Sequence, residues 1–248
     1  MHSSTKRYLL ILLACLASTL SSAQDLGACS RVDISLGAKY NACKELVSDS
    51  KYSKTQQARA AVMAGLLNQM NKGSAHESIG LFLLGVDKGD LSGYALIGDI
   101  YREGYGSVSK DFEKALDYYY RDTSNSHVKT NGLALLNLYG QGVEQNYAKA
   151  LALTWMTFQQ SANSLYSDRI CNLYAEEKYG LQNITKAHMW CSLSVKFENH
   201  PQLKAYYEDK RFKLAAKLSP TQLVQSNNLL KKCESPGYMY CEVELNIK

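Results

Sequence analysis

Proline is scarce in this sequence, with 3 in 248 residues, and glycine, with 16, is no more frequent than in an average protein. A collagen-like fibre requires glycine at every third position, so this architecture is excluded. Hydrophobic residues make up 46% of the chain and charged residues 21%. This is an ordinary globular composition that argues against wholesale disorder. The length allows one large domain or two small ones.

A strong excess of charge of one sign is also missing. The formal net charge is +5, and it becomes +5 − 2 = +3 if the N-terminal segment with Lys6 and Arg7 is removed. Proteins that bind nucleic acid through phosphate contacts carry a larger or more clustered positive charge. Nucleic acid is therefore not an expected partner.

Sequence motifs for common chemistries are absent too. There is no Gly-x-Ser-x-Gly elbow, phosphate-binding loop, His-Glu-x-x-His helix or dinucleotide fingerprint. The 5 histidines lie far apart and lack the paired Cys, Asp or Glu spacing of a metal site, and no Cys-x-x-Cys pair occurs. Acidic side chains near Asp99 and Asp111 fit a solvated helix face and a helix cap better than an acid/base pair. We expect no catalytic residue, no metal and no cofactor.

The N-terminus reads as a secretory signal. Basic residues in Met1–Arg7 precede an apolar run that ends near Leu20, and small residues follow up to Ala23. The run is too short for a comfortable membrane span, and no other stretch is long enough, so no transmembrane segment is expected. Cleavage after Ala23 gives a periplasmic or secreted protein. An alternative is lipidation at Cys15, because residues 12–15 resemble a bacterial lipobox, although Leu13 fits its position poorly.

The chain has 7 cysteines, of which 6 remain after this cleavage. An even number in an oxidising compartment favours disulfides, and six cysteines allow 15 pairings. Their clustering along the chain suggests three local pairs. These are Cys29–Cys43, Cys171–Cys191 and Cys233–Cys241.

The middle of the chain repeats with a period of about 36 residues. A Lys-Ala pair occurs at Lys114, Lys149 and Lys186, at intervals of 35 and 37 residues, and Gly104 and Gly140 are 36 residues apart. Repeats of this length are typical of helical-pair solenoids.

Local signals place the helices of each repeat. Gly104 and Gly106 allow the positive φ with which a chain leaves one helix and turns back. Asp111, Asn146 and Asn183 each stand where a second helix should begin and are expected to act as N-caps.

Three further helix starts read as capping boxes, at Ser53, Ser74 and Ser219, each with Glu or Gln three residues later. Around the repeats we expect an N-terminal cap with one helix near residues 36–47 and a C-terminal pair of capping helices. The expected organisation is a signal peptide at 1–23, the N-terminal cap at 24–52, repeats at 53–200 (about 53–90, 91–126, 127–163 and 164–200) and the capping helices and tail at 201–248.

The pattern Leu-Gly-x-x-Tyr-x-x-Gly-x-Gly-Val-x-x-Asp-x-x-Lys-Ala-x-x-Trp-Tyr in these repeats resembles the Sel-1-like repeat, a relative of the tetratricopeptide repeat. The resemblance covers about residues 53–196. It implies an all-α, right-handed α-solenoid of helix-turn-helix repeats, here with disulfide-tied caps. Asn137 departs from the pattern, as do Glu177 and Tyr179 in glycine positions, which predicts a looser last turn. Cys171 and Cys191 fall on positions of paired helices, so we expect them to link these two helices.

Stacked helical pairs expose a concave face, lined mainly by the first helix of each pair, and such proteins bind other proteins with it. We expect a protein or peptide to bind the outward positions of these helices. The candidate partner-binding residues are Tyr94, Asp99, Arg102, Leu135, Leu138, Tyr139, Asp168, Asn172 and Glu176.

Three functions compete. The first is a non-enzymatic, periplasmic or secreted protein-binding scaffold. The second, which the family resemblance allows, is an envelope immunity or inhibitor protein that neutralises a toxic effector or regulates a peptidoglycan enzyme. The third is a β-lactamase-like hydrolase, as claimed for cysteine-rich relatives of the repeat. Those relatives resemble one another in a cysteine pair in every unit, whereas residues 97–155 contain no cysteine, which counts against an enzyme.

Overall fold

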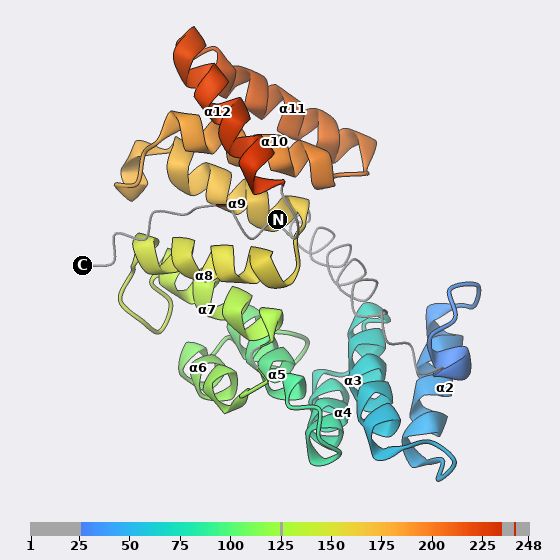
Figure 1. The fold of residues 1–248 in the computed structure, drawn as a ribbon. Coiled ribbons are helices and arrows are strands. Elements are labelled where there is room, and N and C mark those ends of the chain that lie inside the picture. Colours follow the sequence, from blue (N-terminus) through green and yellow to red (C-terminus); the bar gives the residue numbers. More distant parts are fainter. Residues whose placement is uncertain (1–25, 125, 235–240, 242–248) are drawn as a thin grey trace. The chain divides into compact units, whose positions relative to one another are not determined.

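The computed structural model describes residues 26–124, 126–234 and 241 and is helical throughout (Figure 1). These described residues form eleven α-helices and no β-strand, with a single isolated bridge between Tyr105 and Val108. They divide into two compact units, one ending at Gly132 and one beginning at Leu133. The all-α fold predicted from the repeats is confirmed.

The first unit consists of helical pairs behind an N-terminal cap. Its core holds apolar side chains from consecutive helices, including the buried Phe82 and Ile97. Its elements are η2 (Gly27–Cys29), α2 (Leu36–Ser48), α3 (Lys54–Met70), α4 (Ala75–Asp87), α5 (Ser92–Glu103), α6 (Phe112–Arg121) and the start of α7 (His127–Tyr139).

The second unit has one core, in which the rings of Phe158 and Trp190 meet edge to face at 5.0 Å. Helices α11 and α12 both pack on α10. The elements are the end of α7, α8 (Tyr147–Gln160), α9 (Ser164–Ala175), η3 (Glu177–Tyr179), α10 (Ile184–Phe197), α11 (Pro201–Ala215) and α12 (Pro220–Cys233).

The turn between paired helices is built in the same way in successive repeats. Gly104 and Gly140 leave the first helix with φ of 70° and 63°. The backbone N–H of each N-cap residue then donates to a carbonyl near the end of the first helix. These bonds are Asp111 to Tyr101 at 2.8 Å, Asn146 to Asn137 at 2.9 Å and Asn183 to Tyr174 at 2.8 Å.

The last repeat lacks the glycine pair and forms a different turn. Residues Glu177–Tyr179 make a short 3₁₀ helix, and Gly180 follows in the left-handed region with φ of 65°. Glu177 and Tyr179 can therefore replace the two glycines, because the residue with positive φ is now Gly180.

The predicted N-caps form. The side-chain oxygens of Asp111, Asn146 and Asn183 accept the backbone N–H three residues later at 2.8–3.0 Å. Complete capping boxes begin α3 at Ser53 and α12 at Ser219.

The capping box predicted at Ser74 is wrong. Ser74 makes no side-chain cap bond to α4. Glu77, its expected partner, instead accepts hydrogen bonds from the Tyr40 hydroxyl and from Lys44 Nζ, the latter at 3.2 Å. The Glu77 carboxylate, which the local pattern assigned to the cap, therefore binds side chains of α2 instead.

The six cysteines are joined in three local pairs. Cys29–Cys43 ties η2 to α2, Cys171–Cys191 links α9 to α10, and Cys233–Cys241 ties the chain after α12 back to that helix. Their Cα atoms are 4.6, 5.3 and 4.3 Å apart. A further bond holds Cys241, whose carbonyl accepts from Trp155 Nε1 of α8 at 2.7 Å.

Candidate functional site

Only some of the predicted partner-binding residues face outward. Tyr139 is 60% exposed, and Tyr94, Asp99, Asp168, Asn172 and Glu176 are partly exposed. The expectation of an outward position is wrong for Arg102, Leu135 and Leu138, which are 7%, 2% and 7% exposed. The stretch 133–138 is apolar at five of six positions, so periodicity could not say which of its side chains point inward.

Arg102 is buried because it belongs to a polar network between α5 and α6. Its Nε donates to Tyr119 Oη at 3.0 Å and to Asp99 Oδ1 at 3.2 Å, and its Nη2 contacts Glu103 at 2.7 Å. Tyr119 Oη in turn donates to Asp99 Oδ1 at 2.6 Å. The buried cation therefore has two carboxylates and a hydroxyl around it, as burial of charge requires.

The network shifts the pKa values of its members in the directions that this geometry dictates. Burial by itself lowers the pKa of Arg102, but the adjacent Asp99, Tyr119 and Glu103 outweigh it and raise this pKa above its usual value. Burial and the Asp99 carboxylate raise the pKa of Tyr119 well above its usual value. Both groups hold their protons at neutral pH, so neither supplies a general base.

Tyr119 fits between two helices because glycine faces its ring from both. A Cβ at Gly98 of α5 would lie 2.6 Å from Tyr119 Cε1, and one at Gly132 of α7 would lie 2.2 Å from its Cζ. The Tyr119 ring is therefore completely buried between these helices.

Tyr94 lies beside two other half-buried tyrosines of the first unit. The rings of Tyr101 and Tyr118 stack at 5.6 Å, and Tyr94 is tilted against Tyr118 at 6.3 Å. Lys114 and Arg121 lie over the rings of Tyr101 and Tyr118 at 5.4 and 5.2 Å. These cations cover the aromatic faces that a ligand would need for stacking.

The predicted row on α9 is partly engaged with its neighbours. Asp168 forms an ion pair with Lys210 of α11 and accepts from Asn172 Nδ2 at 3.3 Å. Glu176 pairs with Lys178 at 2.5 Å, and its side chain stays 42% exposed. Asp168 thus holds α11 in place, whereas Glu176 remains accessible at the end of α9.

One repeat position is accessible in three successive first helices. The position is the last residue of α5 and of α7 and the residue directly after α9, and it is occupied by Glu103, Tyr139 and Glu176, at intervals of 36 and 37 residues. The side chain of Glu103 is 40% exposed, and Tyr139 is 60% exposed as a residue. Glu103 and Glu176 pair with Arg102 and Lys178 and keep part of their surface exposed, whereas Tyr139 presents a largely exposed aromatic residue.

The buried histidine of the second unit joins two helices. His188 Nδ1 of α10 lies 2.8 Å from Ser226 Oγ of α12, and both residues are buried. Burial, with a smaller effect of nearby Arg211, lowers the pKa of His188. A serine next to a histidine can form a nucleophilic dyad, but Ser226 has no exposed surface at which a substrate could react.

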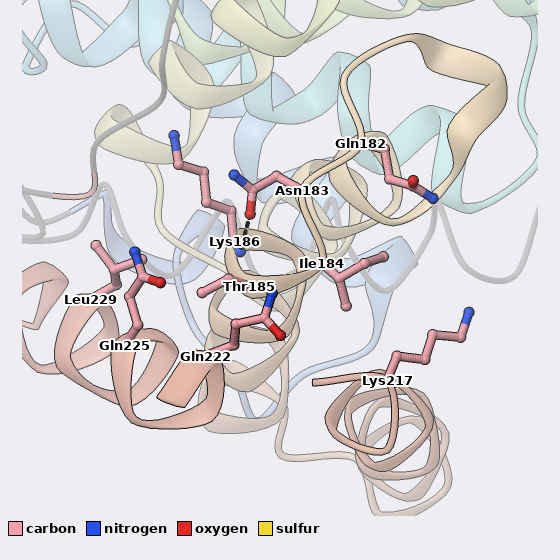
Figure 2. A pocket seen from close by; sticks show the side chains of 9 residues that line it. All are labelled: Gln182, Asn183, Ile184, Thr185, Lys186, Lys217, Gln222, Gln225 and Leu229. Carbon is pink, nitrogen blue, oxygen red and sulfur yellow. Dashed lines mark hydrogen bonds between the residues drawn. The ribbon is translucent and has the colours of Figure 1, made fainter. Parts of the chain in front are cut away.

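A pocket that sequence reasoning missed opens where α10, α11 and α12 meet. Its volume is about 460 Å³, within the range of small-ligand sites. Figure 2 shows residues at the start of α10 next to Gln222 and Gln225 of α12, with Lys217 after the end of α11. The lining residues are Gln182, Asn183, Ile184, Thr185, Lys186, Lys217, Gln222, Gln225 and Leu229.

Comparison with known proteins identifies the repeat. The Sel1 repeat model matches residues 91–121 and 130–154, which cover α5–α6 and most of α7–α8. No curated protein matches the chain.

One solved structure shares the helical-repeat fold of this chain. A Sel1 repeat protein from Oxalobacter formigenes superposes with a TM-score of 0.55 and 18% identity, covering 81% of this chain and 80% of the other. A second structure is c5321, described as a protective antigen present in uropathogenic Escherichia coli strains that displays an SLR fold. Its TM-score is 0.42 at 15% identity, covering 83% of this chain and 56% of the other. The matched residues and the paired helices show that the chain contains Sel1 repeats.

Proposed function

We propose that this protein is a non-enzymatic, periplasmic or secreted scaffold that binds a protein or peptide partner through its first helices. The observation that carries the proposal lies in the second unit, where Tyr139 at the end of α7 and Glu176 after α9 are both accessible. Tyrosine is enriched among the residues that contribute most to binding. An exposed tyrosine together with a carboxylate suits a partner that offers basic and apolar side chains.

The proposal of a non-enzymatic role is supported by how the reactive groups are used. Arg102 and Tyr119 are locked with Asp99 in a buried network, and His188 is buried against Ser226. Among the described residues, no cluster of three His, Cys, Asp or Glu side chains could hold a metal ion. The polar residues of the described chain thus support its helices.

An extracytoplasmic location is supported by the three cysteine pairs, because disulfides persist in oxidising compartments. Within residues 26–124, 126–234 and 241, no helix is long and apolar enough to cross a membrane. The signal peptide at 1–23 and the alternative lipid anchor at Cys15 lie outside the described residues.

Affinity capture from envelope extract tests the proposal, with the non-reduced mature protein as bait. The test variant is Tyr139→Ala. The matched control is Tyr120→Ala, which removes a tyrosine that is 63% exposed on the second helix α6.

We expect one stoichiometric partner that binds the wild type and the control and is lost with Tyr139→Ala. Its identity separates a toxic effector from a peptidoglycan enzyme. Equal capture by all three baits, or capture of no partner, would refute the proposal. Hydrolysis of a chromogenic β-lactam by the same preparation would favour an enzyme instead.

A further inference from the structure

We propose that the pocket between α10, α11 and α12 binds a carboxylate carried on a short aliphatic stem. This site is separate from the first-helix surface proposed above, because it is lined by the second helix of the last repeat and the C-terminal helices. The two proposals can therefore fail independently.

The electrostatics of the pocket favour an anion. Among its nine lining residues, Lys186 and Lys217 are cationic and none is acidic. The ammonium of Lys186 lies 5.6 Å from the centre of the Tyr174 ring, which leaves Lys217 as the cation that a ligand in the pocket would meet. The first turn of α10 contributes a weaker positive potential to the same space.

Two of the four carboxamides of the pocket are oriented as donors. Asn183 Oδ1 accepts the backbone N–H of Lys186 at 3.0 Å, and Gln222 Oε1 accepts that of Ser219 at 2.9 Å. Since a backbone N–H can only donate, these bonds fix where each amide oxygen lies. The amide NH₂ is the group that each side chain can offer to a ligand.

Two NH₂ groups and an ammonium select a ligand that accepts hydrogen bonds and carries negative charge, which a carboxylate does. Ile184 and Leu229 line the same pocket with aliphatic surface. They match an apolar stem next to the carboxylate, such as the last side chain of a peptide. The volume of about 460 Å³ admits such a group together with its adjoining peptide unit.

The same chemistry could come from a peptide C-terminus or from a free aliphatic acid. Isothermal titration of the full mature protein with three probes separates these sources. The probes are acetyl-Ala-Leu with a free carboxylate, the same dipeptide with a C-terminal amide, and 4-methylpentanoate. Inorganic phosphate serves as a competitor that carries charge without a stem.

The pocket variants are Lys217→Ala, which removes a cation, and Gln225→Glu, which adds a carboxylate of the same size. The matched control is Lys213→Ala, because Lys213 is exposed on α11, pairs with Asp209 and does not line the pocket. Far-UV circular dichroism checks that each variant keeps its helices.

We expect the free-acid dipeptide to bind saturably and the amide to bind at least about tenfold more weakly, as the loss of one charge-assisted hydrogen bond implies. Lys217→Ala and Gln225→Glu should weaken binding by a similar factor, and Lys213→Ala should leave it unchanged. Equal binding of 4-methylpentanoate supports the site and assigns it to a free acid. The proposal is overturned if no acid binds, if acid and amide bind alike, if folded pocket variants bind like the control, or if phosphate competes as well as the carboxylates.

Discussion

Removing the hydroxyl of Tyr119 tests whether the buried network between α5 and α6 stabilises the fold. Tyr119 has no exposed surface, and its hydroxyl makes two hydrogen bonds, at 2.6 Å to Asp99 and at 3.0 Å from Arg102. Tyr119→Phe keeps the ring, which fills the space between Gly98 and Gly132. The substitution therefore isolates the polar contribution from the packing.

The expected loss follows from the partners that remain. A hydrogen bond to a charged group contributes about 1.5–3 kcal/mol. Arg102 keeps Asp99 at 3.0 Å and Glu103 at 2.7 Å after the substitution, so the larger cost of about 3–5 kcal/mol for an unpaired buried charge does not apply. We expect the free energy of unfolding to fall by about 2 kcal/mol.

Urea denaturation followed by far-UV circular dichroism measures this change. Tyr120→Phe, on the same helix, is the control, because Tyr120 is 63% exposed and its hydroxyl should contribute less than about 0.5 kcal/mol. If Tyr119→Phe costs no more than this control, the network does not stabilise the fold and the reasoning is refuted.

Three further predictions concern other parts of the chain. Ser219→Ala should lower the free energy of unfolding by about 1 kcal/mol because it removes a complete cap, whereas Ser74→Ala should change it little because Ser74 caps nothing through its side chain; equal losses in urea denaturation would contradict this. Burial lowers the pKa of His188 below 6.5, so the unfolded chain binds the proton more tightly and the melting temperature should fall as the pH drops below 6.5. His188→Gln should flatten this dependence, and an unchanged profile would argue against it. Replacing both Cys171 and Cys191 by serine opens a link across 20 residues and should cost about 3 kcal/mol in denaturation of the non-reduced protein; an unchanged midpoint would show that the pair does not stabilise the fold.

The accuracy of the sequence-based predictions depended on how local each interaction is. The N-caps at Asp111, Asn146 and Asn183 involve atoms three residues apart, and the pattern identified them. The sequence at Ser74 fits the same local rule, but no capping box forms there because Glu77 binds Tyr40 of α2. A local signal fails when a residue distant in sequence offers the same group a better partner.

The candidate sites depended on distant contacts. Arg102 was expected on the surface because the repeat pattern assigned it an outward position on the first helix. Its burial requires Tyr119 from the next helix, which periodicity alone does not reveal. The pocket was missed because it exists only where α11 and α12 pack on α10, and none of its glutamines stands out in the chain.

The sequence by itself determined the repeat, the helix starts and the turn glycines such as Gly104, because each depends on backbone preferences within a few residues. Tertiary structure alone decided which side chains of the first helices are buried, how Glu77 is used, and where the polar pocket opens. These outcomes depend on packing between helices, because the side chains of neighbouring helices determine whether a given side chain is buried or exposed.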